Sequence, residues 1–122
     1  MPIRPFLFTD TVVLTANGSG TARMPISAGE KARFRALRFV ATGAFNLLTI
    51  RDDSGQRYSN SSADDPIPST LLQDARNAFR SIDGFKPDLE LEGPTGLNFE
   101  LTDTSAAGNT VRIVAEGEKE TG

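Results

Sequence analysis

The 122-residue chain contains no cysteine, no histidine and no tryptophan. Without cysteine it cannot form disulfides, a thiolate nucleophile or a zinc–thiolate site, so packing and hydrogen bonding must stabilise it. Without histidine it lacks the commonest general base and the commonest metal ligand. We therefore expect a non-enzymatic protein with no catalytic residues, no cofactor and no bound metal.

Long apolar runs are absent as well. The N-terminal residues include Arg4 but no apolar stretch of signal-peptide length, and no segment approaches the roughly 20 apolar residues that span a bilayer. We expect a protein made in the cytoplasm and not secreted by a signal peptide, with no membrane contact. The net charge of −3 also argues against nucleic acid as the main ligand.

The charge is unevenly distributed along the chain. Residues 1–60 contain eight Lys or Arg against four Asp or Glu, whereas residues 86–122 contain three against eight. In a β-sandwich, strands from the two ends can lie side by side. The complementary charges could then stabilise the monomer, or could let basic and acidic faces of neighbouring copies meet.

Short β-prone runs separated by turn residues predict about eight strands. They lie at residues 5–15, 21–26, 31–42, 44–51, 57–58, 89–91, 97–101 and 111–115. Asn17-Gly18 is typical of a hairpin turn. In the third run Phe34 has the opposite parity to Leu37, so a bulge near Ala36 is needed to bury both. The pattern predicts an all-β fold, an antiparallel two-sheet sandwich of jelly-roll type.

One segment differs from the rest of this single domain, residues 1–122. Residues 60–84 form a polar insertion, and within it residues 69–82 carry apolar side chains at helical spacing, which predicts one short helical insertion. Residues 117–122 contain no large apolar side chain, and we expect this tail to fray.

Asp53-Ser54-Gly55 resembles the half-site of a retroviral-type aspartic protease, in which two chains pair their aspartates around one water. That motif requires an apolar residue before the aspartate and a small residue after the glycine, where this chain has Asp52 and Gln56. Asp, Ser and Gly are also the residues that turns select, so a structural turn is favoured over a protease half-site. The acidic residues of this segment could also coordinate calcium, but a solvated acidic turn is the favoured interpretation.

The candidates for an interface are basic and N-terminal. Lys31, Arg33, Arg35 and Arg38, with Arg51 on the following strand, could bind an acidic partner surface, since arginine is enriched at interfaces. Alternatively, they could pair across strands with Glu90, Glu92 or Glu100. Pro5 and Phe6, in the proline-bearing N-terminal segment, complete the interface candidates.

The last third of the chain carries a family resemblance. Its features are Gly93-Pro94-Thr95-Gly96-Leu97, Phe99-Glu100-Leu101, Thr102-Asp103-Thr104-Ser105 and Asn109-Thr110-Val111-Arg112-Ile113. Together with residues 43–45, 50–52 and 58–60, this order resembles small phage virion structural proteins of the capsid decoration or cement type. The resemblance implies a homo-oligomer located in the virion that binds the major capsid protein or other virion proteins, without catalytic residues.

A carbohydrate-binding β-sandwich is the other non-enzymatic alternative. Such modules usually present aromatic rings for stacking on sugars. This chain has no tryptophan and only one tyrosine, Tyr58, so that platform is poorly supplied.

Overall fold

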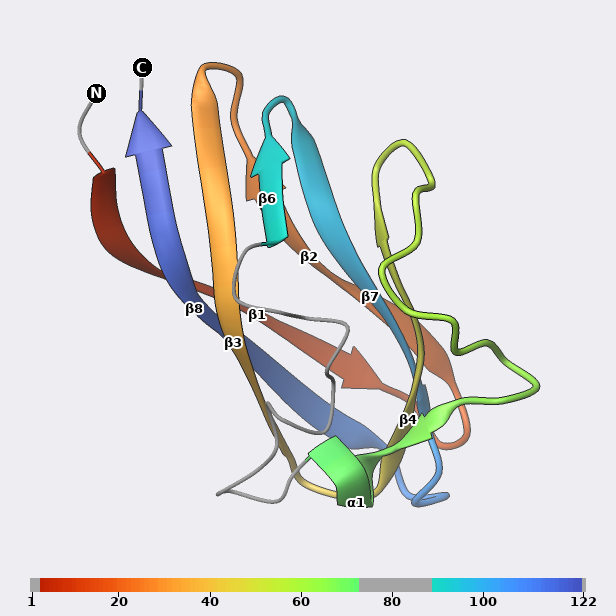
Figure 1. The fold of residues 1–122 in the computed structure, drawn as a ribbon. Helices are drawn as coiled ribbons and strands as arrows, with labels where there is room; N and C mark the ends of the chain where they lie inside the picture. The colour runs from red at the N-terminus through yellow and green to blue at the C-terminus, as the bar shows by residue number, and fades with distance from the viewer. Residues whose placement is uncertain (1–2, 73–88, 122) are drawn as a thin grey trace.

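The structure, a computed structural model, describes residues 3–72 and 89–121. It is all-β, with two antiparallel four-stranded sheets packed face to face (Figure 1), as predicted. Sheet A contains, in order, β1 (Ile3–Leu14), β8 (Asn109–Thr121), β3 (Glu30–Ala41) and β6 (Leu89–Glu92). Sheet B contains β2 (Ser19–Ile26), β7 (Thr95–Asp103), β4 (Phe45–Asp52) and β5 (Ile67–Pro68).

The core between the sheets follows the alternation of each strand. On β7, Leu97, Phe99 and Leu101 are fully buried, while the residues between them face outward. Beside them in sheet B lie Phe45, Leu47 and Ile50 of β4, and sheet A contributes Phe34, Leu37, Phe39, Val111 and Ile113. The described residues therefore pack around one hydrophobic core.

The predicted bulge in β3 is confirmed. The pairing of β3 with β8 shifts register between Phe34 and Ala36, and both Phe34 and Leu37 are fully buried despite their opposite parity. The extra residue, Arg35, lets the strand bury apolar side chains on both sides of the bulge.

The predicted hairpin at Asn17-Gly18 is wrong. The turn forms, with Gly18 donating its N–H to the Thr15 carbonyl at 2.8 Å, but it carries the chain from sheet A to sheet B. Strand β1 pairs with β8, and β2 pairs with β7. Both strands have apolar faces, and placing them in different sheets buries the two faces against each other.

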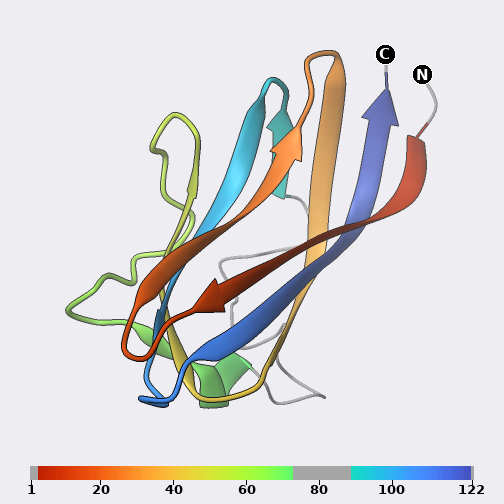
Figure 2. The same cartoon turned by 180° about the vertical axis from the view of Figure 1, so that it is seen from behind.

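Asp103 joins two turns at the end of the sandwich opposite the chain termini (Figure 2). Its buried carboxylate accepts hydrogen bonds from the Ser105 hydroxyl at 2.6 Å and from the Asn17 N–H at 2.8 Å. The hydrogen bond from the Ser105 hydroxyl, with those from the backbone N–H groups of Asn17 and Ser105, holds the pKa of Asp103 well below its usual range. The carboxylate therefore fixes the β1–β2 turn to the β7–β8 turn.

Two further expectations for local structure need correction. Residues 57–58 form only an isolated bridge, Arg51 to Arg57, and β5 is the eighth strand instead. The expected fraying of the tail is wrong for residues 117–121, because β8 lies between β1 and β3 and is hydrogen-bonded along both edges.

Of the helical window, the structure describes one turn, α1 (Ser69–Leu72); residues 73–82 lie outside the described residues, so the helical insertion stays a prediction. No helix in the described part of the chain is long and apolar enough to cross a membrane.

Candidate binding surface

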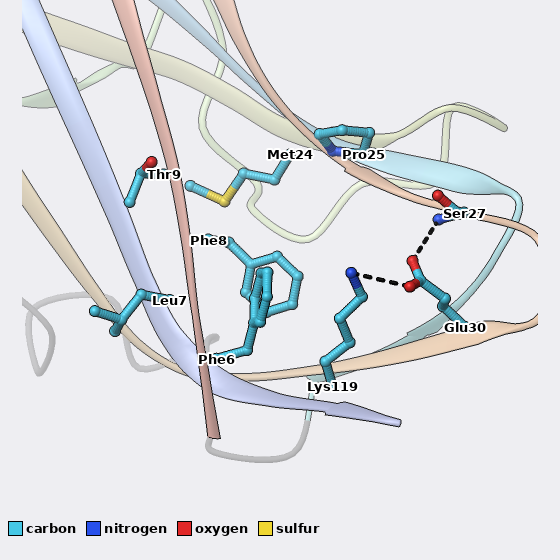
Figure 3. A pocket seen from close by; sticks show the side chains of 9 residues that line it. All are labelled: Phe6, Leu7, Phe8, Thr9, Met24, Pro25, Ser27, Glu30 and Lys119. Atoms are coloured by element: carbon cyan, nitrogen blue, oxygen red, sulfur yellow. Dashed lines mark hydrogen bonds and ion pairs between the residues drawn. The ribbon is translucent and has the colours of Figure 1, made fainter. Parts of the chain in front are cut away.

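Strand β1 carries an uncharged row of side chains on the outer face of sheet A. Because strand residues alternate, its odd-numbered residues point away from the core. We call these the β1 stripe: Ile3, Pro5, Leu7, Thr9, Thr11 and Val13, all of them exposed. Leu7 points to the opposite side of β1 from Phe6 and Phe8 (Figure 3) and is 62% exposed, and Val13 is 74% exposed. A contiguous exposed row that contains large apolar side chains is a candidate binding surface.

The other strands of sheet A carry the charged side chains of its outer face, and the sign of the charge differs between the two ends of the strands. The end near both chain termini (Figure 1), the acidic end, carries Glu116, Glu118 and Glu120 of β8, Glu90 and Glu92 of β6, with Lys31 and Arg33 of β3. The other end, the basic end, carries Arg38, Val40 and Arg112. Val40 is 67% exposed beside Arg112.

The predicted interface arginines of β3 pair across strands. Arg33 donates to Glu90 at 2.8 Å and Arg38 donates to Glu116 at 3.0 Å. The hydrogen bond from Arg33 lowers the pKa of Glu90. These pairs are about half exposed, and each contributes little to folding stability. The cross-strand alternative is therefore correct for Arg33, whereas Arg38 pairs across strands with Glu116, a partner that was not predicted. Both pairs still leave the arginines on an exposed face. The side chain of Arg35 lies outside the described structure.

Arg51 does not belong to this group. The connection between β3 and β4 crosses from sheet A to sheet B, so Arg51 lies on the outer face of the other sheet. There its guanidinium pairs with Glu100 at 2.6 Å. The predicted cluster of Arg51 with the β3 arginines is wrong. It assumed that consecutive strands are neighbours in one sheet, whereas β3 and β4 lie in different sheets.

Pro5 and Phe6, the N-terminal candidates, point to opposite sides of β1. Pro5 belongs to the β1 stripe, whereas Phe6 lines a groove of about 360 Å³ between β1 and β2 (Figure 3). The ring of Phe6 packs edge-on against Phe8 at 4.7 Å between centroids. On its other side lies the Lys119 ammonium, 4.6 Å from the ring centroid.

The Lys119 ammonium also closes this groove with an ion pair. It lies 2.9 Å from Glu30, and this contact lowers the pKa of Glu30. Apolar side chains line the inner wall, and the two charges at the rim neutralise each other. The groove could therefore accept an apolar side chain.

Asp53, the residue of the protease alternative, is held as an ionised turn residue. Its carboxylate lies 2.5 Å from the Arg23 guanidinium and accepts a hydrogen bond from the Asn98 amide at 2.9 Å. The bond from Arg23, followed by that from Asn98, lowers the pKa of Asp53. An aspartic protease needs a carboxyl group that shares a proton with a second one. This geometry favours the structural turn over the protease half-site.

The outer face of sheet B has a polar hollow of about 350 Å³ beside this turn, lined among others by Asp53, Asn98, Arg51 and Glu100. None of its lining residues is aromatic. Arg51 pairs with Glu100 within the hollow, and Asp53 pairs with Arg23 beside it. Within the described ranges 3–72 and 89–121, no group of three or more acidic residues is placed to hold a metal ion. The hollow therefore gives little support to sugar binding.

The sequence-based candidates missed Leu7, Val13, Val40 and Arg112. The available pattern was the uncharged series at alternate positions from Ile3 to Val13. It could not be assigned to a face, because the intervening positions include Phe6, Phe8 and Leu14, which are also apolar. Arg112 gives no signal of its own, because the sequence shows it only as a polar position between the apolar residues Val111 and Ile113.

No known protein-family model matches the chain, and no curated protein matches it at a significant level. The function is therefore inferred from the geometry, together with the resemblance in the sequence.

Proposed function

We propose that the chain is a non-enzymatic virion structural protein of the capsid decoration or cement type, which binds the major capsid protein or another virion protein and its own copies. The observation that carries the proposal is the β1 stripe, six uncharged side chains that are all exposed along one strand. Burying such a row against a partner removes apolar area from water, and that is the main driving force of association.

The strand order supports a jelly roll, an architecture common among viral capsid proteins and lectins. The antiparallel pairs are β1 with β8, β2 with β7, β3 with β6, and β4 with β5. These are the pairs of one long hairpin that is folded over onto itself. We therefore propose the jelly-roll topology for the sandwich, and this places the chain in an architecture used for shells and for surface binding.

Association through a face fits the edges of the sandwich better than strand-to-strand pairing does. The end strands β1 and β2 lie next to each other (Figure 2) and contain Pro5 and Pro25. Proline has no backbone N–H to donate, and it commonly blocks pairing at sheet edges. The edges formed by β1 and β2 are therefore protected, whereas the outer face of sheet A is open.

The proposal is tested by mixing the purified chain with empty capsids assembled from the major capsid protein of the same virion. The wild-type chain is expected to co-sediment with the capsids at a fixed stoichiometry. The double variant Leu7→Glu with Val13→Glu is expected to remain folded and to lose most of this binding, because it places charges in the β1 stripe.

The matched control is Gln56→Glu with Asn60→Glu, which adds the same charge at exposed positions after β4. It should bind capsids as the wild type does. A wild-type chain that stays in the supernatant at all concentrations, or a stripe variant that binds as well as the control, would overturn the proposal.

A further inference from the structure

We infer that the outer face of sheet A binds the same face of a second copy of this chain, with the strands of the two copies antiparallel about a two-fold axis. This inference deepens the proposed function, since binding to its own copies is part of that proposal. The two-fold contact covers the β1 stripe, so a second copy and the capsid compete for the same face. It depends on the order of charged and apolar side chains across β1, β8 and β3.

The registers of sheet A place the outward side chains in six rows that cross the strands. From the acidic end to the basic end, the rows are Ile3–Glu120–Lys31, Pro5–Glu118–Arg33, Leu7–Glu116, Thr9–Val114–Arg38, Thr11–Arg112–Val40 and Val13–Thr110. The first three rows contain every carboxylate of these six rows. The last three contain two arginines and, among the described residues, no carboxylate.

Arg112 is the arginine of the basic end that has no carboxylate partner among residues 3–72 and 89–121. Its Nε donates to the Thr11 hydroxyl at 3.3 Å. Its neighbours across the strands are Thr11 and Val40, and the exposed Val13 lies one row further along. An arginine surrounded by exposed apolar and threonine side chains has the composition of a binding hot spot, and it needs a carboxylate on the partner.

The second copy provides that carboxylate in one arrangement. A two-fold axis between the third and fourth rows reverses the strands and lays the first row of each copy over the last row of the other. Glu118 of one copy then faces Arg112 of the second copy, and Ile3 faces Val13. The symmetry forms each contact twice.

No like charges oppose each other in this register. Glu116 faces Val114 of the second copy, Glu120 faces Thr110, and Arg33 faces Val40. With the strands parallel instead, each row would face itself, and the glutamates of β8 would oppose glutamates. Like charges in contact across an interface cost several kcal/mol, so the antiparallel arrangement is selected.

The area is sufficient for a specific but modest contact. Twelve strand residues at about 3.3 Å each and three strands at about 4.8 Å spacing give a face of roughly 40 by 14 Å. Two such faces bury about 1,100 Å² in total, the lower end of the range for specific interfaces. The charge pairs should therefore decide whether the dimer forms, and added salt should weaken it.

The experiment is a charge exchange measured by sedimentation velocity over a concentration series. Arg112→Glu alone and Glu118→Arg alone each place like charges at both symmetric contacts, and each should raise the dimer dissociation constant about 100-fold or more. In an equimolar mixture of the two variants, every contact again joins Glu to Arg. The mixture should recover dimers with a dissociation constant within about tenfold of the wild type.

Arg4→Glu is the matched control, because Arg4 is exposed on β1 but has the parity opposite to the stripe. It should dimerise as the wild type does. Circular dichroism checks the fold of each variant. Should Glu118→Arg fail to fold, the wild-type dissociation constant at about 50 mM and about 500 mM salt decides instead, and it should rise with salt.

A monomeric wild type, single variants that dimerise like the control, or a mixture that does not recover would each overturn the assignment of this face. Capsid co-sedimentation by the same samples is a separate readout. If capsids are bound while the mixture fails to recover, the proposed function stands and only the two-fold contact is lost. If dimers recover but capsids are not bound, the two-fold contact stands and the proposed function is lost.

Discussion

Gly117 is a position where one methyl group should disturb the whole of sheet A. It lies on β8, opposite Phe6 of β1 and Phe34 of β3, at the start of the β3 bulge. A Cβ on this residue would collide with the Arg33 carbonyl oxygen and would lie 3.2 Å from the Phe34 Cα. Both are backbone atoms, so no change of side-chain rotamer can make room and β3 itself must move.

Two opposing effects set the size of the change for Gly117→Ala. Overpacking against a rigid neighbour costs about 1–3 kcal/mol. Replacing a strand glycine by alanine recovers about 0.5–1 kcal/mol, because the unfolded chain loses less freedom on folding. Because the colliding atoms belong to the backbone, the overpacking cost lies in the upper part of its range, about 2–3 kcal/mol. We therefore expect the free energy of unfolding to fall by about 1–2.5 kcal/mol, out of a total of about 5–15 kcal/mol for a domain of this kind.

Urea unfolding followed by circular dichroism measures this change. The midpoint should fall while the dependence on urea concentration stays the same, since the exposed area is similar. Thr110→Ala, at an exposed position of the same strand, is the control and should change stability by less than about 0.5 kcal/mol. A Gly117→Ala variant as stable as the wild type would mean that β8 does not approach β3 here and that the tail frays as the sequence suggested.

Three further predictions follow from single side chains. Asp103→Asn should destabilise the fold near neutral pH, because the lowered pKa of Asp103 contributes stability that is present above about pH 4 and lost as the pH falls. The melting temperature of the variant, measured over a series of pH values, should therefore fall less on acidification than that of the wild type. Partial burial of Tyr58 and the hydrogen bond that its hydroxyl donates to Asp52 at 2.8 Å raise its pKa to about 12. Ultraviolet absorbance should therefore show this single tyrosine titrating near pH 12 in the folded protein and near pH 10 in urea. Arg38→Ala should change the unfolding free energy by less than about 1 kcal/mol, because its pair with Glu116 is exposed.

The sequence predicted what depends on local alternation. Leu97, Phe99 and Leu101 are buried as their spacing indicated, and the conflicting parities of Phe34 and Leu37 located the bulge. These features are local, because a strand with one buried face must place its apolar residues at every second position.

What the sequence did not predict depends on which edges pair. The Asn17-Gly18 turn has the same local chemistry whether it joins two strands of one sheet or two sheets, so the hairpin prediction failed. The same crossing between sheets separates Arg51 from the β3 arginines. The charged end of β8 is a strand because it is central in sheet A, where hydrogen bonds along both edges replace the apolar contacts that its sequence lacks.

The candidate surface combines both kinds of information. Uncharged residues alternate along β1, but the neighbouring positions are also apolar, so the exposed side is known only from the packing of Phe8 and Leu14 in the core. The opposed ends of the outer face depend on the register of β8 against β1 and β3, which joins residues about 100 positions apart.

The most direct test of the assembly role is the mass of the purified chain in solution, measured by multi-angle light scattering over a concentration series, alone and with empty capsids. The account predicts a monomer–dimer equilibrium at low salt and uptake of the chain onto the capsids. A single 13.1 kDa species at every concentration that also leaves the capsids unoccupied would contradict it.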